Sequence, residues 1–456
     1  MIITERELYI KTPGSNENLL AYFAEQVKKC LAPNEVPVRF VVSSTNKKEY
    51  LCELGVLENS ENDSRLDVPS IFSCRTRSYE NTEQFNIALI IPTGIGCELG
   101  GHSGDGGAVA RLFASMCDQL ITHPNVVNAA DINELPANGL YVEGSVLTRL
   151  FMGTATLQKV RANRVMLVVD RHEDPMFHEL AVNSASAARA AMGMDIPLVV
   201  IMDKPILMRA QFSISGRAAG RIEHFQNLHK VLSEHEGEYD AVALSTLICI
   251  PSHFHADYFK EEKGFSVNPW GGVEAMLTHT ISSLFNVQSA HSPMMTSQEV
   301  MNLNVGIVDP RKSAEAVSTT YLHCVLKGLH RAPRILDGIH SGSGLTSIND
   351  ISCLVIPDGC IGLPVLAAIE NEIPVIAVKD HSSNMKNELS ALPFKENKLF
   401  FANNYLEAAG IAASLKAGIA LDSLKRPLAQ TKISIQSRQF GKNDTEDPVA
   451  MSEKNV

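Results

Sequence analysis

From about residue 85 onward, short and nearly continuous apolar runs alternate with segments in which the apolar residues follow a helical period. Strands buried on both faces carry apolar side chains at almost every position, which is typical of parallel strands covered by helices. The repeated order of strand and helix favours an open, doubly wound sheet. We therefore expect an α/β fold with two Rossmann-like lobes, each built on a doubly wound, mostly parallel sheet.

The same pattern predicts where the individual elements lie. The predicted strands cover residues 86–91, 164–169, 197–202, 241–250, 352–357, 374–378 and 398–402. The predicted helices cover residues 107–121, 177–192, 220–233, 273–285, 313–329, 363–370 and 405–416.

The two ends of the chain differ from this central region. Strands are predicted at residues 1–9, 36–43 and 50–56, with a helix at 18–31. From about residue 430 the chain is polar and lacks periodicity, which is typical of disorder. We expect a small N-terminal α/β unit at 1–80, a first lobe with a glycine-rich loop at 85–250, a second lobe at 251–425 and a disordered tail at 430–456.

The composition argues against several classes of protein. With 40 Lys and Arg against 51 Asp and Glu, the net charge is −11, which disfavours a broad nucleic-acid-binding surface. No apolar run reaches the roughly 18 residues of a membrane span, and the N-terminus lacks the apolar segment of a secretory signal. The nine Cys are dispersed without a CxxC pair, which favours reduced thiols and a cytoplasmic protein. The sequence leaves open whether the chain forms a homo-oligomer.

A glycine-rich turn between residues 94 and 107 follows the first strand predicted in the central region. Glycine permits positive φ and lets a ligand approach the main chain, and a helix that starts beyond such a turn offers free N–H groups to an anion. The turn also resembles a GxGxxxG dinucleotide fingerprint, but no acidic residue follows at the next strand end, so nicotinamide dinucleotide is not favoured. The alternative is a surface turn without a ligand. Candidate substrate-binding residues here are Gly94, Gly96, Gly100, Gly101 and Asp105, and His102 is a candidate catalytic residue.

A second turn, at residues 357–364, repeats this plan of strand end, proline, glycine and cysteine. Cys97 and Cys360 each lie near a predicted helix start, where a thiolate is stabilised. Two facing thiols could act as acid and base, or one of them as a nucleophile. The alternative is that each Cys is a small buried apolar residue. Asp358 and Gly359 of the second turn are further candidates for substrate binding.

Two polar clusters are candidates for recognising an anionic ligand. His123, Asn125 and Asn128 follow a predicted strand end, where they suit carboxylate or hydroxyl groups, although such residues also hold ordinary loops together. Arg217 and Arg221 lie four residues apart at a predicted helix entrance. On one helical face they could clamp a carboxylate or phosphate, unless an acid such as Glu223 pairs with them.

Several histidines and one glutamate are candidates for acid–base chemistry. Glu274, His279 and His291 lie in turn regions or a helix of the second lobe, although each alone is more often structural. His253, His255 and Asp257 would project to one side of an extended segment as a metal triad, but no helical metal motif supports them, so no divalent metal is favoured. The sequence contains neither GxSxG nor GxxxxGK[ST].

Several long motifs occur in a fixed order, and the set resembles the bacterial, cyanobacterial and plant family catalogued as domain of unknown function 3326. They include IIPTGIGCELGGHSGD, THPNVVNAADIN, LYVEGSVLTRL, SGRAAGRIE, NPWGGVEAMLTH, SAHSPM, VDPRKSAEAVS and IPDGCIGLPVLAAIE. The resemblance covers about residues 86–419. It implies one inherited unit and brings no activity, cofactor or catalytic residue with it.

Together these features predict an enzyme that acts on a small, carboxylate-bearing anionic metabolite in a cleft between the lobes. We expect a biosynthetic lyase or isomerase that uses thiol-assisted proton transfer, addition/elimination or isomerisation. One alternative is a nucleotide- or nucleotide-sugar-dependent transferase that holds phosphate at the first glycine-rich turn. Another is a metabolite-binding protein without catalysis.

Overall fold

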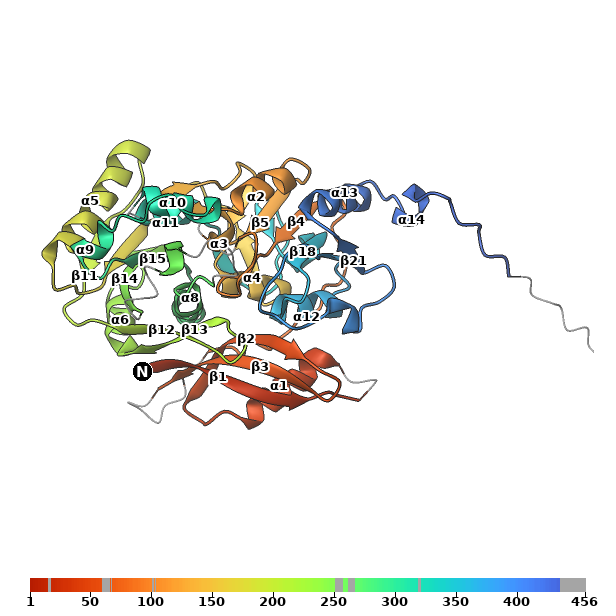
Figure 1. Cartoon of the computed structure of the whole chain (residues 1–456), viewed down its shortest axis with the longest axis horizontal. Helices are drawn as coiled ribbons and strands as arrows, with labels where there is room; N and C mark the ends of the chain where they lie inside the picture. Colours follow the sequence, from red (N-terminus) through yellow and green to blue (C-terminus); the bar gives the residue numbers. More distant parts are fainter. Residues whose placement is uncertain are drawn as a thin grey trace, which may run out of the picture.

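The computed structural model describes residues 1–14, 18–59, 66, 68–100, 102, 104–250, 257–260, 267–318 and 321–434. It is a mixed α/β structure with two large sheets, one of ten strands and one of six, and two small sheets. In Figure 1 the six-stranded sheet lies on the right, the parallel strands of the larger sheet lie on the left, and the N-terminal strands lie below both. None of the helices in the described ranges has the length and apolar character of a membrane span.

All strand pairs of the six-stranded sheet are parallel. The strand order is β21 (Leu399–Ala402), β20 (Val375–Val378), β18 (Cys353–Pro357), β4 (Asn86–Leu89), β5 (Gln119–Thr122) and β8 (Gly139–Tyr141). The helices that follow these strands are α2 (Gly107–Ala114), α4 (Gly144–Phe151), α12 (Leu363–Glu370) and α13 (Tyr405–Lys416). Strands β4, β5, β18 and β20 are buried along their whole length, and apolar runs predicted β4, β18 and β20, whereas β5 overlaps the end of the helix predicted at 107–121.

This sheet joins two segments that we expected in different lobes. Strand β4 pairs directly with β18, so residues near the start of the family-like region lie beside residues near its end. The strand pairing therefore does not divide the chain near residue 250.

Four parallel strands form one side of the ten-stranded sheet, in the order β11 (Leu198–Ile201), β10 (Val165–Val169), β14 (Ala241–Cys249) and β15 (Gln288–Met294). The helices that accompany them are α5 (Pro175–Met192), α6 (Phe225–Glu234), α8 (Gly271–Phe285) and α11 (Leu322–His330). Strand β14 also pairs with β12 (Leu207–Phe212), which forms an antiparallel hairpin with β13 (Ala218–Glu223). Helix α8 packs across this hairpin and lies near the centre of the molecule (Figure 1).

The N-terminal segment forms the other side of the same sheet. It contains β1 (Ile2–Lys11), α1 (Leu19–Lys29), β2 (Glu35–Thr45) and β3 (Glu49–Glu58). Asn18 caps α1, and Phe23 of this helix packs against Phe40 of β2 with a centroid distance of 5.1 Å. Strand β1 is hydrogen-bonded to β13, and β2 is hydrogen-bonded to β19 (Ile361–Gly362). Because these edge strands pair with the rest of the chain, the sheet of the N-terminal segment is not separate.

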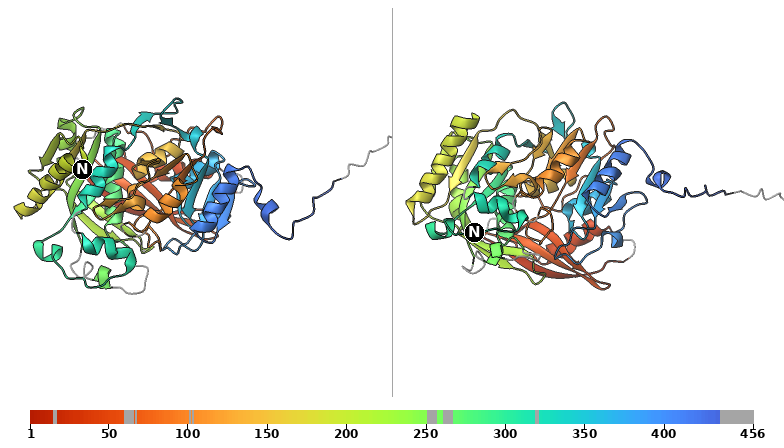
Figure 2. Two further views of the ribbon diagram at one scale, coloured as in Figure 1. Left: turned by 90° about the horizontal axis from the view of Figure 1, so that it is seen from above. Right: turned by 45° about the horizontal axis from the view of Figure 1, so that its top comes forward.

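The remaining described elements are short. Strand β9 (Ala155–Gln158) pairs with β16 (Arg334–Asp337) and β17 (Leu345–Thr346), and β6 (Asn128–Ala129) pairs with β7 (Ile132–Asn133). The other helices are α3 (Pro124–Val127), α9 (Gln298–Met301), α10 (Ser313–Val317), α14 (Leu421–Leu424) and the 3-10 turns Pro310–Lys312, Ile348–Asp350 and Leu389–Ala391. The segment from α14 to residue 434 extends away from the body (Figure 2), and residues 435–456 of the predicted tail lie outside the described residues.

Three predicted helices differ from the structure, and local backbone geometry accounts for two of them. The helix predicted at 107–121 ends at Ala114, because a turn follows and Asp118 then bonds to Phe85 at the start of β5. The helix predicted at 220–233 is strand β13 followed by α6, since His224 has a φ of 59° and breaks the chain direction between them. The helix predicted at 313–329 is divided into α10 and α11.

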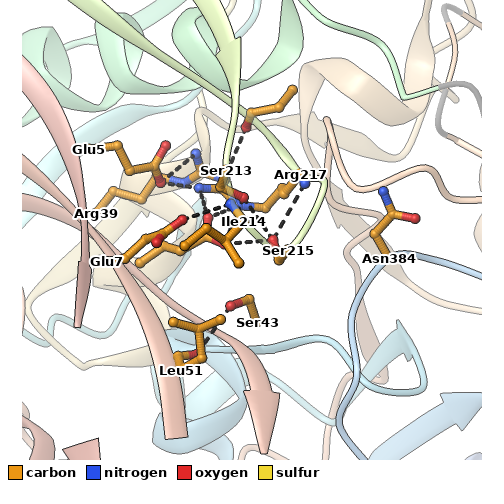
Figure 3. A network of polar contacts seen from close by, with 12 residues as sticks. Glu5, Glu7, Arg39, Ser43, Leu51, Ser213, Ile214, Ser215, Arg217 and Asn384 are labelled. Atoms are coloured by element: carbon orange, nitrogen blue, oxygen red, sulfur yellow. Dashed lines mark hydrogen bonds and ion pairs between the residues drawn. The ribbon is translucent and has the colours of Figure 1, made fainter. Parts of the chain in front are cut away.

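A buried ionic cluster connects the N-terminal strands to the β12–β13 hairpin (Figure 3). The fully buried Arg217 pairs with Glu5 of β1 and Glu53 of β3. Ser213 and Ser215 donate hydrogen bonds of 3.0 and 2.7 Å to Oε1 of Glu53. Since a buried charge is costly unless it is paired and hydrogen-bonded, these contacts fix how the hairpin sits on the N-terminal sheet.

We predict that Arg217→Met lowers the free energy of unfolding by about 3–5 kcal/mol, because Glu5 and Glu53 would remain buried without their main counterion. Urea denaturation at pH 7 measures this change. Arg221→Met on the same hairpin is the control, since Arg221 is half-exposed and its ion pair with Glu223 contributes only about 0–1 kcal/mol. Equal losses in the two variants would contradict the prediction.

Candidate functional site

A cavity of about 1170 Å³ lies where the two large sheets and the N-terminal strands meet. Residues at or just beyond the carboxyl ends of β5, β8, β14 and β18 line it, as do residues of β2, β15 and α8. In open α/β sheets the carboxyl ends of parallel strands form the usual ligand site, because the loops that leave them converge there. This cavity is therefore the candidate functional site.

One pair in the cavity consists of His279 on α8 and Glu143 at the start of α4. Nδ1 of His279 lies 2.7 Å from Oε1 of Glu143, and the exposed fractions of the two side chains are 17% and 2%. Glu143 also accepts hydrogen bonds from the backbone of Ser145 and Val146 and from the hydroxyl of Thr278. Burial alone would raise the pKa of Glu143, but the charge of His279 and these hydrogen bonds lower it to about 2. Glu143 is thus a buried carboxylate in ion-pair contact with the imidazole of His279, although the Nδ1–H of that ring is not aligned with it for a hydrogen bond.

A second pair has the opposite arrangement, with the carboxylate toward the cavity. Nδ1 of His291 lies 2.9 Å from Oε1 of Glu274, and its Nε2 lies 2.7 Å from the hydroxyl of Thr246. The His291 side chain is 1% exposed and that of Glu274 is 24% exposed. Because both nitrogens of His291 are engaged, its role is to hold Glu274 in place, and Glu274 is the group that can meet a ligand.

Glycines let α8 bring both pairs into position. A Cβ on Gly272 would lie 2.2 Å from the carbonyl oxygen of Ala218, so α8 can press against β13 only with glycine there. A Cβ on Gly144 would lie 2.7 Å from Cε1 of His279. Glycine at residue 144 therefore leaves the space that the His279 ring occupies beside the start of α4.

His123 adds a neutral imidazole to the cavity wall. The backbone N–H of Ile91 donates to Nε2 of His123 at 3.1 Å, which leaves the proton of the neutral ring on Nδ1. Burial lowers the pKa of His123 to about 4, with Glu143 opposing this shift and His279 adding to it. At neutral pH His123 can donate one hydrogen bond to a ligand without carrying charge.

The two predicted asparagines also line the cavity, but their amides bond within the chain. Asn125 donates to the carbonyl of Ile91 at 3.0 Å and to that of Gly100, and Asn128 donates to the hydroxyl of Tyr141 at 2.9 Å. They hold the loops around the cavity in the described structure, which is the alternative that the sequence left open.

The two similar turns lie side by side, because the strands that precede them are neighbours. Gly94 and Gly359 have φ values of 71° and 82°, and the thiols of Cys97 and Cys360 are close enough to influence one another electrostatically. Cys360 lines the cavity, whereas Cys97 is 1% exposed. Burial, with Cys360 adding to it, raises the pKa of Cys97 well above the usual thiol value. The expectation that a helix start would stabilise a Cys97 thiolate is therefore wrong, since α2 begins only at Gly107.

The other candidates in the first turn make contacts within the chain. A Cβ on Gly100 would lie 2.5 Å from the side chain of Ile91, so this glycine allows close packing of the chain. Asp105 accepts a 2.7 Å hydrogen bond from the Gly100 N–H, and burial raises its pKa to about 7. His102 is 1% exposed and lies 2.9 Å from the hydroxyl of Tyr258, and burial lowers its pKa to about 4. Gly96 has a φ of 73°, and Gly101 lies outside the described residues.

The predicted anion clamp of Arg217 and Arg221 is also wrong. Both residues belong to the β12–β13 hairpin rather than to a helix, and each is paired with a carboxylate of the chain itself, Arg221 with Glu223 at 2.7 Å. Asp358 likewise accepts backbone hydrogen bonds within the chain, from Gly359 of its own turn and from Leu389 of a distant 3-10 turn.

The described residues do not form a metal site. No three His, Cys, Asp or Glu side chains within the described ranges are grouped so that they could hold a metal ion. Of the predicted triad, His253 and His255 lie outside the described residues, and Asp257 is exposed.

Comparisons with known proteins find similarity over most of this chain. The family described as a protein of unknown function, DUF3326, matches residues 86–425. The chain belongs to this family. It is also 33% identical over 358 residues to a protein of Synechococcus sp. named an uncharacterized lipoprotein, which covers 77% of this chain and 98% of that protein. No solved structure matches. Within the DUF3326 region lie Glu143, His279, Glu274 and His291, whereas the β1–β3 strands precede it.

The pairing of Glu143 with His279 was not predicted from the sequence. Its only local signal is an acidic residue directly before Gly144 and Ser145, where a carboxylate can cap a helix. Nothing in the spacing of residues 143 and 279 shows that they meet, because α4 and α8 are brought together only by the fold.

We predict that His123 makes the protein lose stability as the pH falls. Its pKa is depressed from 6.5 to about 4 in the folded state, so the stabilisation is complete above pH 6.5 and is lost as the pH falls toward 4. The contribution lost by pH 5 is about 2 kcal/mol. In urea denaturation at pH 7 and pH 5, His123→Gln should show a smaller difference than the wild type. His340→Gln, which replaces an exposed histidine, should retain the wild-type difference.

We further predict that Cys97 stays unmodified when the native protein is treated with iodoacetamide at pH 8. Its thiol is buried and its pKa is raised, whereas Cys30 and Cys249 are exposed and should react. Mass spectrometry of peptides measures the modification at each residue, and unfolding in urea should make Cys97 reactive. A Cys97 that reacts as fast as Cys30 in the native protein would contradict the buried, protonated thiol.

Proposed function

We propose that this protein is an enzyme that transfers protons to and from a small metabolite bound in the cavity, as a lyase or isomerase does. The observation that carries the proposal is the His279 imidazole, which reaches the cavity while the buried Glu143 carboxylate holds its other side. A carboxylate this close to one nitrogen of a histidine stabilises the imidazolium that forms when the ring takes a proton.

The roles of the side chains follow from which nitrogen or oxygen is already engaged. Nδ1 of His279 faces Glu143, so Nε2 is the nitrogen that accepts the substrate proton. Glu274 lies five residues earlier on α8, about 7.5 Å along the helix axis, and its carboxylate is the second acid–base group. His123 supplies the Nδ1–H donor for a substrate oxygen on which negative charge develops.

This arrangement also favours a class of substrate. Removal of a proton from carbon by an imidazole requires a neighbouring carbonyl or carboxylate group that takes up the electron pair. A neutral histidine donor suits the oxygen of such a group, because it stabilises developing negative charge without binding the ground state as an ion pair. We therefore propose a substrate that carries a carbonyl or carboxylate beside the reacting carbon. The proposed chemistry does not depend on a Cys97 thiolate.

One observation favours a second candidate function, a nucleotide- or nucleotide-sugar-dependent transferase. The cavity volume of about 1170 Å³ exceeds the common range of about 300–1,000 Å³ for small-molecule sites, and strands of two sheets end at it. A rise in melting temperature with nucleoside diphosphates, but not with simple carboxylates, would favour this function over proton transfer.

We predict that the wild-type chain exchanges carbon-bound hydrogen for solvent deuterium in a substrate of the proposed class. Pools of carbonyl- and carboxylate-bearing metabolites are incubated with the full-length protein in deuterated water, and mass spectrometry identifies compounds that gain deuterium. His279→Asn should slow this exchange by about 10²–10⁴-fold, because the general base is removed. Glu274→Gln should slow the completed reaction, since the second acid–base group is lost.

His340→Asn is the matched control, because it replaces an exposed histidine outside the described cavity lining. Its exchange rate should equal that of the wild type, and the melting temperature of each variant shows whether it is folded. A substrate that exchanges equally fast with wild type and with folded His279→Asn protein would exclude His279 as the base. Absence of exchange and of product in every pool would count against an enzyme of this class.

A further inference from the structure

We propose that Arg39 of β2 is the residue that binds an oxyanion of the ligand, either a carboxylate or a phosphate, at the N-terminal wall of the cavity. The inference rests on the proposed function only in that both place a ligand in the same cavity. It names the charged group of that ligand and assigns its recognition to a segment that precedes the DUF3326 region.

The strand register places Arg39 on the face of the N-terminal sheet that looks toward the cavity. Glu5 of β1, Gly55 of β3 and Arg39 lie in one row across the three strands. A Cβ on Gly55 would lie 3.0 Å from Cβ of Arg39, so glycine at this position gives the arginine its space. The neighbouring Phe40 packs against α1 through Phe23, although it also lies among the residues that line the cavity. Arg39 lines the cavity as well.

The guanidinium of Arg39 is buried but lacks a hydrogen bond among the described residues. Its side chain is 9% exposed, and its Nη1 is buried without a hydrogen-bond partner. The nearest acidic atom, Oε1 of Glu5, lies 3.6 Å away, beyond a good hydrogen bond. The carboxylate of Glu5 pairs more closely with Arg217, which also pairs with Glu53 (Figure 3). Arg39 is thus the arginine of this cluster that is left with open donors.

The electrostatic surroundings of Arg39 consist of one like charge and two opposite ones. Burial and the charge of Arg217 lower the pKa of Arg39 to about 10, while Glu5 and Glu53 oppose this shift. The group therefore remains charged at neutral pH while most of its hydration is lost. Buried polar and charged groups are normally hydrogen-bonded, and a guanidinium offers a planar set of donors that matches a carboxylate or phosphate bidentately. An oxyanion from the cavity would supply those missing partners, against repulsion from Glu5.

The position of Arg39 would also set the orientation of the ligand in the cavity. The oxyanion would contact β2, whereas the reacting carbon would contact His279 and Glu274 on α8. Binding by Arg39 then contributes to affinity and orientation and takes no part in proton transfer. The acid–base residues lie inside the DUF3326 region and Arg39 lies outside it, so relatives without a matching N-terminal segment would have to hold their ligands differently.

The test measures binding of two simple anions, inorganic phosphate and malonate, to the full-length chain by isothermal titration calorimetry at low ionic strength. Wild type should bind at least one of them, and the stronger of the two tells whether the site suits a phosphate or a carboxylate. Arg39→Gln should weaken that binding at least tenfold, and Arg39→Lys should weaken it less, because it retains the charge but loses the bidentate geometry. Arg221→Gln is the control, since this arginine is half-exposed, pairs with Glu223 and should leave the affinity unchanged.

Glu5→Gln should change the affinity for the anion in the opposite direction from Arg39→Gln. Removing the carboxylate that competes for Arg39 should tighten anion binding, which a merely structural role of the cluster would not produce. Arg39→Gln removes no hydrogen bond of the described residues, but it removes a buried positive charge 3.6 Å from Glu5, so its melting temperature without ligand should fall, and Arg39→Lys, which retains the charge, separates this loss from the loss of anion binding. Equal affinity of wild type and Arg39→Gln, or no binding of either anion to wild type, would overturn the proposal.

Failure of this proposal is distinguishable from failure of the proposed function. Anion binding that depends on Arg39, without any deuterium exchange that depends on His279, would support the oxyanion site and reject the proton-transfer enzyme. Exchange that depends on His279, together with unchanged anion binding in Arg39→Gln, would do the reverse.

Discussion

The hydrogen bonding of β4 to β18 is the contact on which the rest of the structure depends. These strands come from opposite ends of the DUF3326 region, yet they are neighbours at the centre of the six-stranded sheet. Because they are parallel, the turns that follow them leave the sheet at the same edge. The contact of Cys97 with Cys360 and the position of Cys360 in the cavity wall both follow from this pairing. Of the segments between the two strands, β5 and β8 join the same sheet, whereas the parallel strands β10, β11, β14 and β15 belong to the ten-stranded sheet.

Helix α8 carries the two proposed acid–base residues of the cavity. It carries Glu274 and His279 on a segment that crosses from the β12–β13 hairpin to the start of α4. Each of these residues has a partner from a different element, His291 on β15 and Glu143 before α4. In one pair the histidine faces the cavity, and in the other the carboxylate does. The same two residue types therefore provide different acid–base groups, because burial decides which member of each pair can meet a ligand.

The N-terminal strands complete the cavity from a segment outside the family region. Pairing of β1 with β13 extends the large sheet, and the buried Arg217 forms ion pairs with both Glu5 and Glu53 at the junction. Because the Arg217 guanidinium is paired with these two carboxylates, it does not form the predicted anion clamp with Arg221. Arg39 lines the cavity together with Arg75, Arg149 and Arg217, and the sequence did not single it out. Its neighbours on β2 are apolar, and only the register against Gly55 shows that it has room on the cavity side.

The sequence by itself determined the elements and the kind of sheet. Runs such as those of β10, β18 and β20 are apolar at every position, and only strands buried on both faces tolerate this composition, so their type and approximate limits could be predicted. The glycine and cysteine turns and the acid–base character of residues 274, 279 and 291 could be read in the same way, because each rests on neighbouring residues. Partners could not be read, since pairing depends on strand order and helix packing between residues distant along the chain. The tertiary structure alone decided that β4 lies beside β18, that Glu143 holds His279, and that Arg217 is neutralised whereas Arg39 keeps open donors.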